Sequence, residues 1–372
     1  MRILIPTVDY PPIEGGISTV ALELARALHR QGHEVTVVAP LFPNMEAFDA
    51  SEPYTVVRFG GYDAGWFRLV PFLLKSWRHT RGVDRIIAIN ISYGGVLGRI
   101  ARLFRGTTYI NLAYAYEFLK FARNPFARFA LLNLYRNGER TVAISKFTRE
   151  NLIRFGVPED FVRVVLPGAR VPEPIAPDVA AVACRRLDVE GYPFILAVGR
   201  FIPRKGQITI VEALPLLHEW CPNVHLVMVG RGPELAACRR KAEALGMEGF
   251  VHLPGYVPDD TLQALYQTCT CFALPTGEDE DGQVEGFGLV FTEAHAHGKP
   301  VVAGRSGGVV DAVQHDKTGL LVPAGNAERL AEALRRILEN PELAESLGSA
   351  GKKRVEEQLN WDVFAKKLIE GP

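Results

Sequence analysis

Cysteine is scarce in this sequence, and long hydrophobic runs are missing. The 372 residues include 5 cysteines, none of which forms a CxxC pair or has the spacing of a zinc finger. A disulfide framework is therefore excluded, and a reduced, cytosolic setting is expected. The apolar run that opens the chain ends at Pro6, and no window of about eighteen residues is apolar throughout. We therefore predict neither a signal peptide nor a membrane-spanning helix.

Net charge is missing as well. The 42 lysines and arginines balance 42 aspartates and glutamates, so no overall field would attract nucleic acid, and no nucleic-acid partner is expected. The charge is nevertheless uneven, because residues 58–149 hold 16 basic and 4 acidic residues, an excess of 16 − 4 = 12. Aromatic and basic residues interleave within 66–81 and 118–129. This pattern suits docking to an anionic membrane surface or a lipid-linked acceptor, but two ordinary amphipathic helices packed on a sheet would explain it equally well.

The composition, with 48% apolar and 23% charged residues, is typical of a soluble globular enzyme. The length of 372 residues indicates two or three domains. Strand and helix patterns alternate along the chain in two runs. In the first run, an amphipathic helix starts near Ser18 and stops at Gly32, and strands are expected at 2–8, 34–39, 83–91, 107–113 and 141–145. In the second run, strands are expected at 194–199, 225–230, 250–253, 271–274 and 299–303. This alternation predicts an α/β fold with parallel sheets.

Residues 166–177 separate the two runs and contain four prolines. We predict an N-terminal Rossmann-like domain over 1–172 and a C-terminal Rossmann-like domain over 173–358. Two doubly wound domains placed end to end would face each other across a cleft at the carboxyl ends of their strands, where ligands of such folds bind.

Two carboxylates eight positions apart form the tightest group of candidate site residues. Glu285 precedes a helix that is expected to start near Gly288, and Glu293 lies about a turn and a half inside that helix. The amides at a helix start suit a diphosphate. Glu285 and Glu293 would then accept hydrogen bonds from hydroxyl groups on either side of the diphosphate. A nucleotide sugar has this arrangement, because its diphosphate lies between the hydroxyls of the sugar and those of the ribose. Alternatively, Glu285 only caps the helix and Glu293 is a solvated surface residue.

A basic loop is expected after the first strand of the second run. Gly199 would let the backbone approach a ligand, while Arg200 and Lys205 would offset the charge of a departing diphosphate without a metal ion. A solvated basic loop is the alternative. The pair Gly15 and Gly16, at the head of the first helix, is either a similar anion site or a simple turn. It lacks the GxGxxG fingerprint, which argues against a nicotinamide dehydrogenase.

Two further polar groups are expected to have no role as ligands. The four adjacent carboxylates of 278–281 could pass for a metal cluster by composition, but a solvated acidic rim is the preferred interpretation. His295 and His297 lie on a predicted helix, where packing or surface positions are expected for both.

Together these features resemble family 4 of the retaining glycosyltransferases, which have the two-Rossmann architecture called GT-B. In the first half, the resemblance rests on PPIEGGISTVALELARALHRQGHEVTVVAP (11–40) and AISKFTRENLIRFGVPEDFVRVVLPGA (143–169). In the second half, it rests on AVGRFIPRKGQ (197–207), VMVGRGPE (227–234), EGFGLVFTE (285–293), HGKPVVAGRSGGVVDAV (297–313) and KTGLLVPAG (317–325). The closing stretch, 359–372, resembles the final helix of the family, which crosses back onto the first domain.

The resemblance implies roles for the matching positions of the donor site. Arg200 and Lys205 match the basic pair that holds the donor diphosphate, and Gly16 matches the amide that contacts it from the other domain. Arg200, Lys205 and the start of the helix near Gly288 would carry most of the catalytic work, as positive charge fixed in advance.

In the E-x7-E match, Glu285 would hold hydroxyls of the donor sugar and Glu293 those of the nucleotide ribose. The backbone amides of Phe287, Gly288 and Leu289 would contact sugar and phosphate.

One position departs from the family pattern. Many members carry a histidine at the end of the fifth strand, near the reacting sugar carbon, where this chain reads NLAYAYE over 111–117. Tyr114 aligns with that histidine and would donate a hydrogen bond to the sugar. A register shift of two residues would put Tyr116 there instead.

The resemblance implies a retaining transfer of a hexose from a nucleotide sugar to a hydroxyl of a glycan or lipid-linked acceptor. It implies no metal ion, and no cofactor besides the nucleotide sugar, which is a co-substrate. The stretch 285–308 is also somewhat like that of the bacterial mannosyltransferases that build phosphatidylinositol mannosides, which favours GDP-mannose over a UDP-sugar. The expected location is the cytoplasm or the inner face of the membrane. The alternatives are a sugar-nucleotide epimerase of the same architecture and a non-catalytic nucleotide-sugar sensor.

Overall fold

The chain divides into two compact units in the computed structural model, which describes residues 1–62, 65–114, 116–121 and 124–370. The first unit combines Met1–Pro167 with Trp361–Pro372, and the second is Gly168–Asn360. The boundaries expected at 172 and 358 lie a few residues from this division.

A seven-stranded parallel sheet forms the centre of the first unit, in the order β3-β2-β1-β4-β5-β6-β7. Its strands are β1 (Arg2–Pro6), β2 (Glu34–Pro40), β3 (Thr55–Phe59), β4 (Arg85–Ala88), β5 (Thr108–Ala113), β6 (Arg140–Ala143) and β7 (Val162–Val164). Strands such as β1 are almost continuously apolar because both faces of the sheet are covered. The strand order reverses direction between β1 and β4, the position where doubly wound folds bind ligands.

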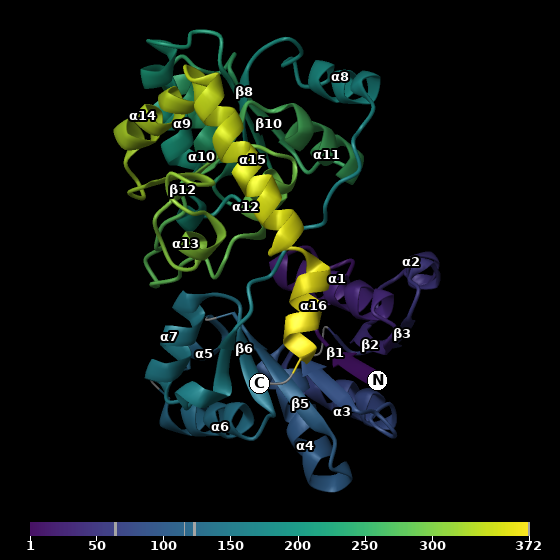
Figure 1. Ribbon diagram of the computed structural model, residues 1–372. Coiled ribbons are helices and arrows are strands. Elements are labelled where there is room, and N and C mark those ends of the chain that lie inside the picture. The colour runs from purple at the N-terminus through teal and green to yellow at the C-terminus, as the bar shows by residue number, and fades with distance from the viewer. Residues whose placement is uncertain (63–64, 115, 122–123, 371–372) are drawn as a thin grey trace. The chain divides into compact units, whose positions relative to one another are not determined.

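Helices cover this sheet (Figure 1). They are α1 (Gly16–Arg30), α2 (Glu46–Ser51), α3 (Leu69–Arg78), α4 (Val96–Arg105), α5 (Tyr116–Leu119), α6 (Pro125–Arg136), α7 (Lys146–Phe155) and α16 (Trp361–Ile369). Short helical turns, η1 (Gly65–Arg68), η2 (Ile91–Gly95) and η3 (Glu159–Phe161), connect some of them. In α1, Val20, Leu24 and Leu28 are buried, as the sequence periodicity predicts. The side chain of Ser145 accepts a hydrogen bond from the Thr148 amide and caps α7.

The second unit contains a six-stranded parallel sheet in the order β10-β9-β8-β11-β12-β13. Its strands are β8 (Phe194–Val198), β9 (His225–Val229), β10 (Val251–Gly255), β11 (Cys271–Leu274), β12 (Val301–Gly304) and β13 (Gly319–Val322). Its helices are α8 (Pro177–Arg185), α9 (Gln207–His218), α10 (Leu235–Ala244), α11 (Asp259–Thr268), α12 (Leu289–Ala296), α13 (Val309–Ala312), α14 (Ala327–Leu338) and α15 (Pro341–Glu357), with a 3₁₀ turn, η4 (Pro203–Lys205). Here the order reverses between β8 and β11, so loops that follow these strands meet at the switch point.

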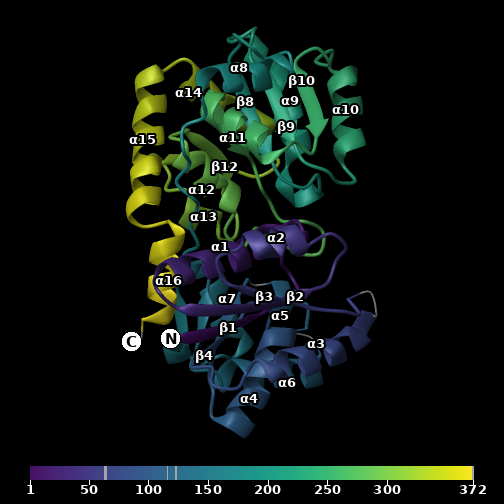
Figure 2. The same ribbon diagram turned by 90° about the vertical axis from the view of Figure 1, so that its right-hand side faces the viewer.

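Helix α16 belongs to the first unit although it ends the chain. It lies beside α1 in both views (Figures 1 and 2). Its apolar face, which includes Phe364 and Leu368, is fully buried. Arg140 donates a hydrogen bond of 2.7 Å to the carbonyl oxygen of Glu370, just after the helix, which suits the negative end of a helix dipole.

The predicted α/β class and doubly wound topology are confirmed in both units. The sequence patterns missed β3, β7 and β13, which are short strands at the edges of the two sheets. Among the residues that the structure describes, no helix is both long enough and apolar enough to cross a membrane.

Candidate functional site

A largely buried ion pair joins two of the predicted site residues in the second unit. The Nζ atom of Lys205 lies 2.6 Å from Oε2 of Glu285. The two side chains are 11% and 17% exposed, so water and salt screen this pair less than a pair on the surface. The fold therefore brings a basic loop and an acidic loop, 80 positions apart, into direct contact.

Glycines let the Lys205 turn lie against the end of the sheet. Gly199 follows β8 with φ +154°, and a Cβ atom at this position would lie 3.8 Å from Cε of Lys205. The turn ends at Gly206, which has φ +71°. A Cβ atom there would come within 2.5 Å of the carbonyl oxygen of Pro275, which directly follows β11. Any other residue at 206 would push the turn away from the switch point.

The backbone of Glu285 is held from the opposite side. The Gly308 amide donates a hydrogen bond of 2.8 Å to the carbonyl oxygen of Glu285. A Cβ atom at Gly307 would lie 2.4 Å from that same oxygen. Helix α13 starts directly after this glycine pair, and the buried guanidinium of Arg354 donates to two carbonyl oxygens at its end, at 2.6 and 2.7 Å. Arg354 therefore anchors the element that positions Glu285.

Two guanidinium groups add positive charge near Glu285. Arg200 is exposed, and within the described part of the chain its guanidinium makes no hydrogen bond or ion pair. Arg204 is half-buried, with Nη1 at 4.0 Å from Oδ2 of Asp279 and 3.5 Å from Oε1 of Gln283. Of the three cations, Arg200 is therefore the one whose charge faces solvent without a salt bridge to a described residue.

The two carboxylates of the E-x7-E pattern have different electrostatic surroundings. Burial raises the pKa of Glu285, but the charge and hydrogen bond of Lys205, with Arg204 and Arg200, lower it by more, so its pKa lies below the usual value. Burial raises the pKa of Glu293, although Tyr266 donates a hydrogen bond of 3.0 Å to it. Glu285 is thus held ionised at neutral pH and can accept hydrogen bonds from hydroxyl groups.

Helix α12 carries Glu293 and begins after Gly288, which has φ +90°. Among the described residues, no side chain caps this helix start. The first two amides of the helix, those of Leu289 and Val290, have no acceptor within it, whereas the Phe291 amide donates a hydrogen bond of 3.1 Å to the carbonyl oxygen of Gly288. A helix start of this kind suits an anion. The side chain of Phe287 is buried, so only its backbone can contact a ligand.

Gly15 and Gly16 lie at the start of α1 in the first unit. Both are exposed, and Gly15 has φ +143°. No side chain of the described residues caps α1, so its first-turn amides are also available to an anion.

Tyr114 directly follows β5, and its hydroxyl group is buried without a hydrogen-bond partner among the described residues. Burial, followed by the charges of Glu117 and Asp9, raises its pKa well above the usual value. The Tyr114 amide donates a hydrogen bond of 2.7 Å to Glu117. Residue 115 and the side chain of Tyr116, on which the alternative register depends, lie outside the described residues.

The prediction of a solvated acidic rim at 278–281 is wrong for one of its four residues. Glu278, Glu280 and Asp281 are exposed, but the Asp279 side chain is only 16% exposed. Asp279 accepts hydrogen bonds from the backbone amides of residues 281 and 283, at 3.2 and 2.8 Å. This carboxylate closes the turn that leads to Glu285 instead of facing water.

The two histidines near the site pack within the fold, as predicted. His295 is fully buried on α12, with Nε2 at 2.8 Å from the carbonyl oxygen of Thr318. His297 is half-buried, with Nε2 at 2.8 Å from Oε1 of Gln263.

Sequence reasoning missed several residues that shape the site. Arg204 was passed over although it lies next to Lys205 in the basic loop. Gly307 and Gly308 were noted only as part of the stretch 297–313, and nothing in the sequence connects Arg354 or Tyr266 with the site. Their roles depend on contacts between distant elements.

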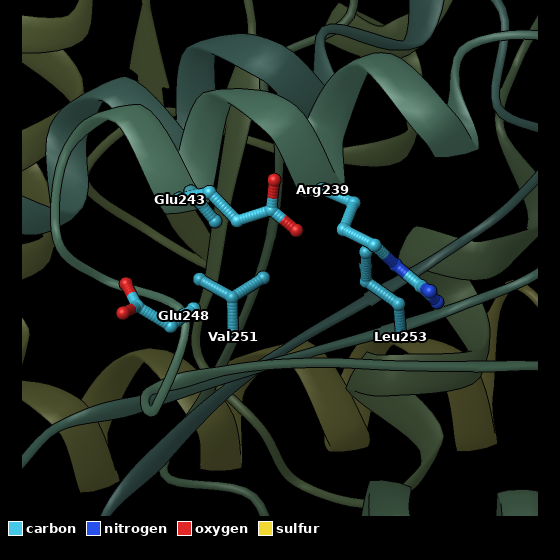
Figure 3. Close-up of a pocket in the computed structure, with 6 residues that line it drawn as sticks. Arg239, Glu243, Glu248, Val251 and Leu253 are labelled. Carbon is cyan, nitrogen blue, oxygen red and sulfur yellow. The ribbon is translucent and has the colours of Figure 1, made fainter.

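A separate hollow lies between α10 and β10 (Figure 3). Arg239, Glu243 and Glu248 surround an apolar floor that includes Val251 and Leu253. None of the predicted site residues lines this hollow. Strand β10 is at the edge of the sheet, two strands away from β8 and the switch point.

Both units match models of glycosyltransferases. Residues 14–171 match the model described as "Glycosyltransferase Family 4". Residues 185–354 match the model described as "Glycosyl transferases group 1".

Two mycobacterial enzymes are similar to the chain over nearly its full length. The GDP-mannose-dependent alpha-(1-6)-phosphatidylinositol monomannoside mannosyltransferase of Mycobacterium tuberculosis is 32% identical over 381 residues, which cover 99% of this chain and 97% of that enzyme. The enzyme of the same description from Mycolicibacterium smegmatis is 29% identical, with coverage of 99% and 97%.

Solved structures share the fold. The Anabaena protein HepE, in complex with UDP and glucose, has a TM-score of 0.81 at 20% identity and covers 99% of this chain and 98% of its own. Sucrose-phosphate synthase from Thermosynechococcus elongatus has a TM-score of 0.80 at 25% identity, with coverage of 99% and 97%.

Proposed function

The chain belongs to glycosyltransferase family 4 and has the GT-B architecture. From this premise we propose a retaining, metal-independent transfer of a hexose from a nucleotide sugar to a hydroxyl group of a glycan or lipid-linked acceptor. The observation that carries the proposal is the contact of Lys205 with Glu285 at the switch point, 2.6 Å between charged atoms. It combines a cation for the diphosphate with an acceptor for sugar hydroxyls.

In the proposed reaction, a bond forms between the acceptor oxygen and the anomeric carbon, and the bond from that carbon to the diphosphate oxygen breaks. The acceptor attacks on the face from which the diphosphate leaves, and its hydroxyl proton passes to a diphosphate oxygen. Arg200, Lys205 and the first-turn amides of α12 stabilise the negative charge that develops on the leaving group. Because these groups are already positioned, no metal ion is needed for that task.

The carboxylates and the tyrosine orient the donor in this proposal. Ionised Glu285 accepts hydrogen bonds from sugar hydroxyls, and Glu293 accepts them from the ribose. Support comes from the low pKa of Glu285 and from the place of Glu293 on α12, beyond the uncapped helix start. Tyr114 donates to the sugar through its hydroxyl group, which has no partner among the described residues. Gly15 and Gly16 supply amides from the first unit.

We propose GDP-mannose as the donor to test first. The mycobacterial relatives are described as GDP-mannose-dependent. HepE, which binds UDP and glucose, supports only the fold because its identity is 20%. A thermal-shift panel of GDP-mannose, UDP-glucose and UDP-N-acetylglucosamine would rank the donors.

Product analysis with the best-binding donor then tests the reaction. We expect nucleotide release that depends on an added acceptor, an α-glycoside from an α-linked donor, and the same rate in the presence of EDTA. Binding without acceptor-dependent release would favour a sensor, and conversion of the donor without an acceptor would favour an epimerase. An inverted product or a rate lost in EDTA would contradict the proposed mechanism.

We also propose that the first unit contacts an anionic membrane surface on the cytoplasmic side. Helix α3 packs Phe72 into the core but leaves Val70 and Leu74 exposed, and α4 exposes Leu103 and Phe104. The same two helices, with the residues just after α3, also carry exposed cations, namely Lys75, Arg78, Arg81 and Arg102. Apolar side chains among basic ones suit the interface of an anionic bilayer. The patch also extends the sequence-based interpretation, because α4 lies outside the two stretches identified there.

Co-sedimentation with vesicles tests the membrane proposal. We expect binding to vesicles that contain phosphatidylinositol, loss of binding at high salt, and loss in the variant Phe104→Glu. The control Val182→Glu, at an exposed position on α8 of the other unit, should sediment like the wild type. Equal recovery in the supernatant with and without vesicles would contradict membrane contact.

A further inference from the structure

The ion pair of Lys205 with Glu285 satisfies the lysine charge before any ligand binds. Both atoms are in contact at 2.6 Å, and both side chains are largely buried. A diphosphate that approaches Lys205 must therefore share the ammonium group with a carboxylate that is already in place. The three N–H donors of lysine allow sharing, but the carboxylate weakens the attraction for a second anion.

Arg200 differs from Lys205 in this respect. Its guanidinium is exposed and has no ion-pair partner among the described residues. Arg204 is directed toward Asp279 and Gln283 instead. A bare nucleoside diphosphate would thus meet one exposed cation that makes no salt bridge with a described residue, Arg200, and one cation already paired with a carboxylate, Lys205.

A nucleotide sugar meets the same pair differently. Its hydroxyl groups donate hydrogen bonds to the Glu285 carboxylate, which spreads the negative charge of that group over new partners and weakens its hold on Lys205. After the sugar has been transferred, this compensation is gone. The Glu285 carboxylate then interacts with Lys205 at full strength again and competes with the remaining diphosphate for the lysine ammonium group.

We propose that Glu285 promotes release of the nucleoside diphosphate product by competing with it for Lys205. This inference rests on the proposed function and adds a role for Glu285 in distinguishing donor from product. The residue that holds the sugar is the same residue that weakens binding of the nucleotide once the sugar has left.

Calorimetric titration with GDP, and with UDP in parallel, tests the inference on the full-length protein. The proteins are the wild type, Glu285→Gln, Lys205→Met and the double variant. We expect Glu285→Gln to bind GDP about three- to tenfold more tightly than the wild type, because the competing charge is gone. Most of this gain should disappear in the Lys205→Met background, because the competition requires the lysine.

Glu212→Gln is the matched control. Glu212 pairs with Lys241 at 2.7 Å on the surface of the same unit, where both side chains are more than a third exposed. This variant removes one negative charge from a Lys–Glu pair outside the site, and its GDP affinity should equal that of the wild type. Thermal unfolding of every variant establishes that the proteins compared are folded.

A second measurement is the salt dependence of GDP binding. The Glu285→Gln affinity should fall more steeply with salt than that of the wild type, since one more cation is free to attract the diphosphate. An affinity of Glu285→Gln no higher than that of the wild type would overturn the inference, as would an equal gain in both lysine backgrounds. If no nucleoside diphosphate bound even the wild type, the proposed function would fail as well, so the two failures are distinguishable.

Discussion

Single residues around the end of β8 differ in how their charges are compensated. Lys205 is paired with Glu285 and Arg204 lies near Asp279, while Arg200 makes no salt bridge with a described residue. In the proposed reaction, Arg200 and Lys205 act on the departing diphosphate as fixed positive charge.

Replacement of either cation should therefore reduce turnover. We expect Arg200→Ala and Lys205→Ala each to lower kcat by about a hundredfold or more, the usual cost of one preorganised donor, with the fold retained. Steady-state kinetics with the best donor, together with circular dichroism, would measure both effects. Arg239→Ala, at the hollow beside α10, is the control and should keep wild-type kinetics. Near-native turnover in both site variants would rule out the proposed mechanism.

His295 makes stability depend on pH. Burial lowers its pKa from 6.5 to about 4, and its Nδ1 atom has no hydrogen-bond partner among the described residues. The unfolded chain therefore takes up a proton at a higher pH than the folded protein does. The free energy of unfolding therefore includes the full contribution of His295 above about pH 6.5. This contribution, at most about 3 kcal/mol, is lost as the pH falls to about 4.

Urea unfolding at intervals from pH 7 to pH 4 would measure this dependence. The variant His295→Gln keeps a side chain that can donate to the Thr318 carbonyl but cannot titrate, so its stability should fall less steeply than that of the wild type. Parallel curves for the two proteins would show that His295 does not contribute.

At the level of elements, α12 depends on α15. Gly351, in the middle of α15, faces His295 on α12, and a Cβ atom at this position would lie 2.5 Å from Cδ2 of the buried imidazole. The same helix carries Arg354, which anchors α13. Helix α15 thus supports the two elements on either side of the Glu285 loop.

An alanine at 351 should disturb this contact. We expect Gly351→Ala to lower the free energy of unfolding by about 1–3 kcal/mol, because the ring must shift in a packed core. The donor KM should rise, since α12 moves with the ring. Denaturant unfolding and kinetics would measure both. Ser349→Ala, at an exposed position of the same helix, should be neutral, and equal stability of the two variants would contradict the expected clash.

At the level of the whole molecule, the chain passes between the two units twice. It leaves the first unit at Pro167 and returns to it at Trp361. The last segment is fixed by burial of Trp361, Phe364 and Leu368, and by hydrogen bonds from Arg85 and Arg140 to the carbonyl oxygens of Ile369 and Glu370. The second unit is therefore tied to the first at both of its ends.

A cut between the units should leave the two pieces associated. We expect that a protease site inserted after Glu173, in an exposed part of the connecting segment, yields two fragments that still elute together in size-exclusion chromatography. Phe364→Ala in the same background removes a fully buried ring, at about 3–5 kcal/mol, and should allow the fragments to separate. Lys366→Ala, an exposed position on α16, is the control. Separation of the fragments without any substitution would contradict the anchoring role of α16.

The sequence by itself determined the class of the fold, the positions of most strands along the chain and the segments that carry the site, because hydrophobic periodicity, glycine and proline act locally. It also placed Arg200, Lys205, Glu285 and Glu293 on loops and a helix start that follow strands. The contact of Lys205 with Glu285, the burial of Asp279 and the support from Arg354 were decided only by the tertiary structure. Each of these joins residues whose pairing depends on which strands become neighbours, and strand order follows from packing of the whole sheet and not from any local pattern.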